Sequence, residues 1–130
     1  MPGPFIFIAT NRLRDGRFGA EQQRVPALSR FIEANEPRLI AFNEYANEDH
    51  TEVTVIQVHP DAASLDFHMG IIGDRARQAY AQTLETTTDI QVFGAPTGNI
   101  LRMLQQQAGS GVPLSIYPHH LGGFTRIPEG

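Results

Sequence analysis

Residues 51–69 constrain the fold of this chain more strongly than any other segment. The run Glu52–Val58, E-V-T-V-I-Q-V, is rich in β-branched residues and predicts a strand. Successive side chains of a strand point to opposite faces, so Val53 and Ile56 lie on different faces of the sheet. Both faces are mainly apolar, and a sheet of this kind must be covered on both sides.

A helix is predicted directly after this strand. Pro60 fixes the entry of the chain, and Asp61 is suited to cap the first turn. An apolar stripe at the spacing i, i+3, i+4 and i+7 is formed by Leu65, His68, Met69 and Ile72. His68 is therefore expected to face the sheet. Gly73 is expected to interrupt the helix, and a second helical stretch is predicted over residues 74–85.

The other predicted elements place this unit within an alternating order of strands and helices. A helix is predicted from about Gln22 to Asn35, with an irregular first turn because Pro26 cannot donate a backbone hydrogen bond. Three further strands are predicted at Phe5–Thr10, Leu39–Tyr45 and Asp89–Phe93. The order β-α-β-β-α-β, with an antiparallel hairpin at its centre, indicates an α+β fold of the ferredoxin-like type. Its sheet would have four antiparallel strands, with both helices on one face.

The length of 130 residues fits a single domain, residues 1–130. Residues 5–95 are expected to form the ferredoxin-like core, and residues 96–130 a C-terminal extension. The extension contains a short helix that Thr97 can cap and Gly109 can end, followed by a short extended segment and a tail.

One face of the predicted sheet carries no helix. The side chains on that face are largely apolar, and the C-terminal extension is too short to cover them alone. We therefore expect a homodimer in which two sheets pack face to face.

Composition and charge exclude several kinds of partner and site. The formal net charge is -4, so no basic surface is expected for nucleic acid or for anionic membranes. The absence of cysteine excludes disulfides, thiolate zinc sites and cysteine nucleophiles. The N-terminal apolar run is too short for a signal peptide, and no run approaches the roughly 20 residues of a membrane span. We expect a cytoplasmic protein.

The element order and the segment T-E-V-T-V-I-Q-V-H-P-D-A-A-S-L-D-F-H-M, with its inward histidine, resemble a known family over residues 5–95. The family is the antibiotic biosynthesis monooxygenase-like domains of the dimeric α+β barrel superfamily. The resemblance implies a dimeric barrel and a cofactor-free oxygenase that acts on a small aromatic or polyketide-like compound. Haem, which some relatives bind, is disfavoured because the chain has no tryptophan and Gln78 stands where an axial histidine is expected.

The same resemblance implies the site. His68 and Asn11 correspond by position to polar residues that border a cleft between the sheet and the helices. A histidine with an ordinary pKa near 6.5 can serve as a general base, and an asparagine can donate to a developing oxyanion. We expect catalysis by His68 and Asn11, and substrate binding by a second group of residues, Tyr45, His59, Tyr80 and Phe7.

Other interpretations of these residues stay open at this point. His68 is equally typical of a semi-buried structural histidine, and His59 of a local turn. A metal site would need these two and His119 or His120 to converge with a carboxylate such as Glu44 or Asp66, so we expect no metal and no cofactor. The alternative function is a ligand-binding or accessory dimeric barrel protein without catalysis.

Overall fold

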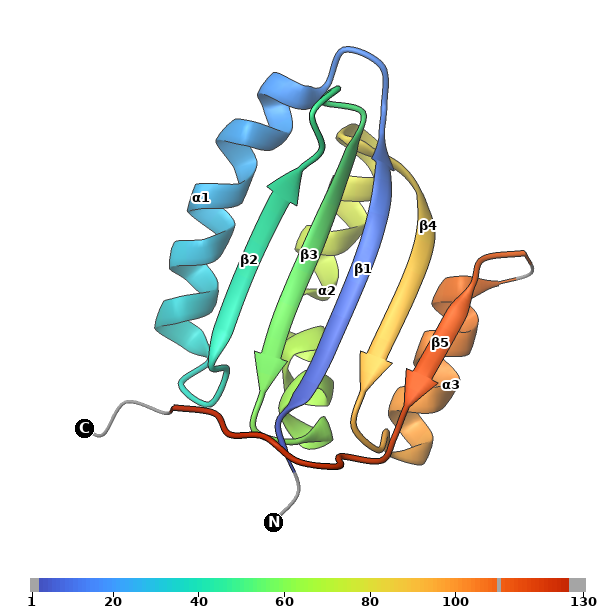
Figure 1. The fold of residues 1–130 in the computed structure, drawn as a ribbon. Helices are drawn as coiled ribbons and strands as arrows, with labels where there is room; N and C mark the ends of the chain where they lie inside the picture. The colour runs from blue at the N-terminus through green and yellow to red at the C-terminus, as the bar shows by residue number, and fades with distance from the viewer. Residues whose placement is uncertain (1–2, 110, 127–130) are drawn as a thin grey trace.

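A computed structural model describes residues 3–109 and 111–126 (Figure 1). The strands are β1 (Phe5–Leu13), β2 (Ala41–Ala46), β3 (Glu52–His59), β4 (Leu84–Phe93) and β5 (Leu114–Tyr117). The helices are α1 (Phe18–Asn35), α2 (Ala62–Gln82) and α3 (Gly98–Ala108). None of the helices in the described ranges is both long and apolar enough to cross a membrane.

The strands form one sheet in the order β2-β3-β1-β4-β5. The pairs β2-β3, β3-β1 and β1-β4 are antiparallel, and β5 pairs with β4 in parallel. The ferredoxin-like α+β fold is therefore confirmed, but the sheet is mixed and has five strands in place of the four predicted. The fifth strand comes from the C-terminal extension, because α3 crosses over from β4 and returns the chain to the edge of the sheet.

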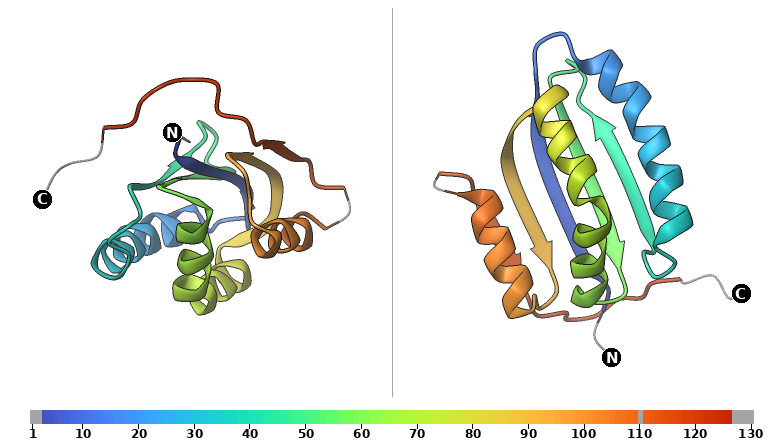
Figure 2. Two further views of the ribbon diagram at one scale, coloured as in Figure 1. Left: turned by 90° about the horizontal axis from the view of Figure 1, so that it is seen from below. Right: turned by 180° about the vertical axis from the view of Figure 1, so that it is seen from behind.

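All three helices lie on one face of the sheet (Figure 2). Alternation along β1 turns Phe5, Phe7, Ala9, Asn11 and Leu13 toward the helices, and each of these residues is buried. The apolar core continues into α2 and α3 through Leu65, Ile100 and Leu104, none of which is exposed. The side of β1 that faces the helices is thus set by its pairing with β3 and β4.

Three predicted boundaries were wrong. Helix α1 begins at Phe18 and continues through Pro26, because Leu28 and Ile32 anchor the helix on the sheet despite the lost hydrogen bond. Helix α2 passes Gly73 without a break, since one glycine costs a helix only about 1 kcal/mol. Strand β4 starts at Leu84, inside the stretch predicted to be helical.

The face of the sheet without helices is apolar at its centre. Ile6 and Ile8 of β1 lie beside Val58 and Ile56 of β3, and all four are only partly buried. The C-terminal segment runs along this side of the sheet (Figure 2) and leaves Phe124 81% exposed. This surface is the one on which the homodimer was predicted, and the dimer stays a prediction.

Candidate active site

A cavity of about 560 Å³ lies between the sheet and the helices. Its floor is made by β1, β2 and β3, its roof by α2, and its sides by α1 and α3. The lining is mainly apolar, with side chains such as Phe7, Phe42, Val55 and Met69. A cavity of this volume, with a mainly apolar surface that also carries polar side chains, is typical of a small-molecule site.

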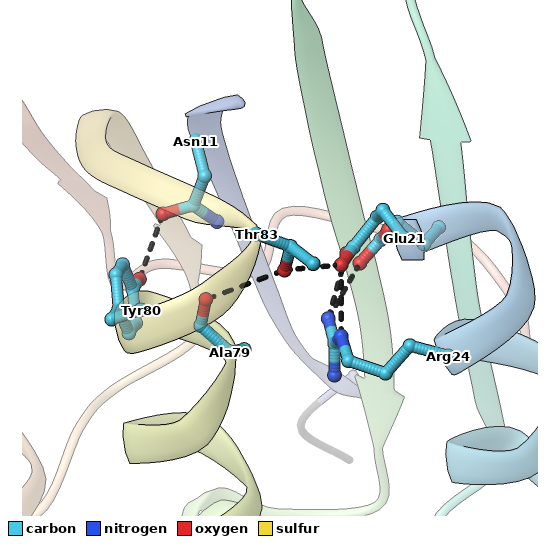
Figure 3. Close-up of polar contacts among 7 residues, drawn as sticks. Asn11, Glu21, Arg24, Ala79, Tyr80 and Thr83 are labelled. Atoms are coloured by element: carbon cyan, nitrogen blue, oxygen red, sulfur yellow. Dashed lines mark hydrogen bonds and ion pairs between the residues drawn. The ribbon is translucent and has the colours of Figure 1, made fainter. Parts of the chain in front are cut away.

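Asn11 is the polar residue at the β1 end of the cavity. The pairing of β1 with β4 shifts register between Thr10 and Asn11, and this irregularity sets Asn11 opposite Thr87. The Asn11 Oδ1 atom accepts a hydrogen bond from the Tyr80 hydroxyl at 2.7 Å (Figure 3). It accepts a second one from the Thr87 hydroxyl, also at 2.7 Å. These bonds fix the orientation of the amide, so its N–H groups are the part that is available to a ligand.

A charged cluster on α1 forms a second polar region (Figure 3). Arg24 donates to both carboxylate oxygens of Glu21, at 2.8 and 2.6 Å, and the Thr83 hydroxyl donates to Glu21 at 2.7 Å. Burial raises the pKa of Glu21, but the hydrogen bonds from these groups outweigh burial and hold that pKa below its ordinary value. Glu21 is therefore ionised and forms a bidentate ion pair with Arg24.

Glu44 lies beside this pair, on the floor of the cavity. Its side chain is 5% exposed, and its nearest cation is Arg24 at 4.0 Å, already bonded to Glu21. Burial, a hydrogen bond with the Glu21 carboxyl group and the Glu21 charge raise the pKa of Glu44 to about 9. Two carboxyl groups in contact do not both ionise readily, so Glu44 holds its proton at neutral pH.

Gln57 connects the cavity with a buried histidine. His59 Nε2 donates to the Gln57 side-chain oxygen at 2.9 Å, and His59 Nδ1 accepts from the Ser64 hydroxyl at 2.7 Å. Burial and the neighbouring His68 lower the pKa of His59 to about 4, so its ring is neutral. His59 does not line the cavity, and it acts on the wall by orienting Gln57, which does.

His68 lies behind the cavity wall, with its ring centre 5.9 Å from that of Phe42, and is not exposed. Its Nδ1 atom bonds the Glu36 carboxylate at 2.8 Å, and its Nε2 atom is buried without a partner in the described residues. Burial lowers the pKa of His68, and the Glu36 charge offsets this only in part. A neutral imidazole tolerates such a buried nitrogen better than a charged one would.

The structure brings Asn11, Tyr80 and Phe7 together in the cavity wall. It does not bring Tyr45 there, because that residue points to the other face of the sheet and is 60% exposed. His119 and His120 lie in the exposed tail. Among residues 3–109 and 111–126, no group of three or more His, Asp or Glu side chains could hold a metal ion.

Sequence reasoning considered Glu44 only as a carboxylate for a metal and did not consider Arg24 or Gln57 for the cavity. A signal for Glu44 was present, because alternation along β2 places it in the same row as Phe42, facing the core. A carboxyl group in an apolar row is unusual and often functional.

The chain was compared with protein families, curated proteins and solved structures. No protein-family model matches the chain, and no curated protein does. Among solved structures, MupZ from Pseudomonas fluorescens is similar over 95% of both chains, with a TM-score of 0.70 and 14% identity. An antibiotic biosynthesis monooxygenase is similar over 72% of this chain and 99% of its own, with a TM-score of 0.55 and 17% identity.

The fold is that of the antibiotic biosynthesis monooxygenases. Rv0793 from Mycobacterium tuberculosis shares it over 73% of this chain and 96% of its own, with a TM-score of 0.58 and 18% identity. The resemblance noted in the sequence is thus confirmed for the fold. At these identities the likeness carries no substrate and no reaction to this chain.

Proposed function

We propose that this protein is a cofactor-independent, monooxygenase-like enzyme that acts on a small aromatic or polyketide-like compound. The observation that carries the proposal is that Asn11 lines a mainly apolar cavity while its side-chain oxygen is occupied by the Tyr80 and Thr87 hydroxyls, which leaves its N–H groups as the donors for a ligand. A donor fixed in this way stabilises negative charge that develops on a ligand oxygen.

The proposed reaction needs no bound redox group. Loss of a proton from an activated CH₂ group gives a carbanion whose charge is delocalised onto a conjugated carbonyl oxygen, where Asn11 binds it. The carbanion reduces dioxygen and forms a C–O bond, giving a peroxide. Protonation and loss of water convert the peroxide to a ketone, so that R₂CH₂ and O₂ yield R₂CO and H₂O. A base is required for the first step, and His68, predicted for that role, does not line the cavity.

The test is oxygen consumption with anthrone, whose carbonyl group and acidic CH₂ group lie on opposite sides of an apolar ring system. Oxidation yields anthraquinone and water, and the quinone is quantified by absorbance against a protein-free control. Asn11→Ala is expected to lower kcat by about 10²- to 10³-fold, the usual effect of removing an oxyanion donor. The matched control is Asn43→Ala, because Asn43 is an exposed asparagine on the opposite face of β2.

A non-catalytic binding protein would bind anthrone without oxidising it. Anthrone oxidation that is equal in the wild type and in Asn11→Ala would contradict the assignment of Asn11. Absence of oxidation in the wild type would contradict the proposed activity toward this class of compound.

A further inference from the structure

Glu44 is the one carboxyl group that lines the cavity, within the described part of the chain. It lies on β2, two strands away from Asn11, with β3 between them. Their partners on β3 are Val55 and Val53, so the two Cα atoms are roughly 12 Å apart at ordinary strand spacing. Asn11 and Glu44 therefore approach a ligand from opposite ends of the floor.

Apart from its hydrogen bond with Glu21 and the Arg24 guanidinium at 4.0 Å, the Glu44 carboxyl group has no charged neighbour among the described residues on the floor of the cavity, which it lines. Arg24 is committed to Glu21, and the side chains of β1 and β3 that share the floor with Glu44 are uncharged. From α2, the cavity receives the Tyr80 hydroxyl and two exposed arginines, Arg75 and Arg77. Arg75 stacks on the Phe31 ring at 3.5 Å and Arg77 pairs with Asp74, whereas the ion-pair contact of Glu44 is with Arg24.

We propose that Glu44 is the base of the reaction, which takes the proton from the ligand CH₂ group while Asn11 binds the carbonyl oxygen. This rests on the proposed function. The Glu44 carboxylate accepts the proton as the C–H bond breaks, and the electron pair stays on the ligand as the carbanion. Once dioxygen has added, the Glu44 carboxylic acid returns the proton to the peroxide oxygen. The carboxylate is regenerated, and no further reagent is needed.

The raised pKa suits this role. A carboxylate with an ordinary pKa is a weak base, whereas one whose conjugate acid has a pKa of about 9 is close in basicity to phenolate. Only the ionised fraction of Glu44 is active, so the rate is expected to rise about tenfold per pH unit below pH 9 and to level off above it. Asn11, with no titrating group, cannot produce this dependence.

The experiment measures proton transfer without oxidation. Anthrone is incubated with the protein in D₂O under nitrogen, and exchange of its CH₂ protons is followed by NMR, with protein-free buffer subtracted. Glu44→Gln is expected to reduce the exchange rate by about 10²-fold or more and to abolish its dependence on pH. Glu48→Gln changes an exposed carboxyl group in the hairpin loop in the same way and should exchange like the wild type.

A second variant separates a catalytic from a merely structural role. Glu21→Gln removes the charge that raises the pKa of Glu44 and frees Arg24 to approach it. The midpoint of the pH profile should then move to lower pH, an effect that loss of packing would not produce.

The outcomes distinguish the two proposals. Exchange that depends on Glu44 without any oxygen consumption supports the base and contradicts the oxidation. Wild-type exchange that Glu44→Gln leaves unchanged overturns the proposal for Glu44, as does a wild type that does not accelerate exchange. A Glu21→Gln profile with an unmoved midpoint also overturns it.

Discussion

Glu44 makes the stability of the protein fall as pH rises above neutrality, and this can be measured without any ligand. The folded protein holds the Glu44 proton up to a pKa of about 9, whereas the unfolded chain releases it near the ordinary glutamate pKa of 4.5. Between these values the folded state binds one proton more than the unfolded state. The free energy of unfolding therefore falls by about 1.4 kcal/mol for each pH unit, and by about 2 kcal/mol from pH 7 to pH 8.5.

The two buried histidines act in the opposite direction and at lower pH. His59, with a pKa of about 4, and His68, whose pKa is also lowered, are neutral in the folded state. The unfolded chain binds protons at both as pH falls below about 6.5, so the stability they contribute is lost from there downward. Above pH 7 their contribution is complete, and Glu44 is the group that sets the slope. Maximum stability is expected near pH 6.5.

The assay is urea unfolding at half-unit steps from pH 5.5 to pH 8.5, at one protein concentration. Glu44→Gln should lose the decline above pH 7, whereas Glu48→Gln should follow the wild type throughout. Taking the difference between variants cancels the groups that they share. The free energy of unfolding could instead change equally with pH above 7 in the wild type and in Glu44→Gln. That result would refute the assignment of a neutral Glu44 and the raised pKa on which its role as a base depends.

Four further variants test the fold and its assembly. The wild type should sediment as a dimer at micromolar concentration and Ile8→Glu as a 14.4 kDa monomer, because Ile8 lies at the centre of the uncovered face; a monomeric wild type would reject the dimer. Gly94→Ala should lose about 1–3 kcal/mol in urea unfolding, since φ is 112° and a Cβ would stand 2.9 Å from the Phe5 ring. Gly70→Ala, with open space around it in α2, should gain about 0.5–1 kcal/mol, and the opposite order of these two variants would contradict both. Leu104→Ala should lose about 2–5 kcal/mol by the same measurement, because Leu104 is fully buried between α3 and the sheet, and a smaller loss would mean that α3 is not anchored there.

The ferredoxin-like core could be predicted because its periodicity is regular. Phe5, Phe7 and Ala9 alternate along the strand on the side of β1 that meets the helices, and the stripe through Leu65 correctly oriented α2. Strand β5 was predicted only as an extended segment. It has four residues, and its pairing with β4 depends on the packing of α3, which no local pattern records.

The site was predicted less completely than the fold. Asn11 was chosen by its position in the family resemblance, and Tyr80 was chosen separately as a further polar group of the pocket. Their bond to each other depends on the register shift in β1 and on an unbroken α2 that carries Tyr80 to the end of that strand. Because the sequence wrongly predicted a break in the helix at Gly73, it did not predict that Tyr80 reaches Asn11. His68 was correctly expected to turn inward, but Glu36, which binds it, lies 32 residues earlier in the chain.

Glu44 is expected to lower the stability of the protein above pH 7 and is proposed to accept the proton of the ligand. These two effects can be separated by experiment. Replacing a buried carboxyl group by an amide of the same shape keeps the hydrogen bonding to Glu21 available and removes the group that ionises. Glu44→Gln should therefore be at least as stable as the wild type above pH 7 and yet exchange anthrone protons more slowly. A merely structural carboxyl group would give no such inverse relation, because its loss would lower stability and activity together. Finding stability raised and proton transfer lost in one variant would locate the chemistry at β2, beside the ion pair of Glu21 and Arg24.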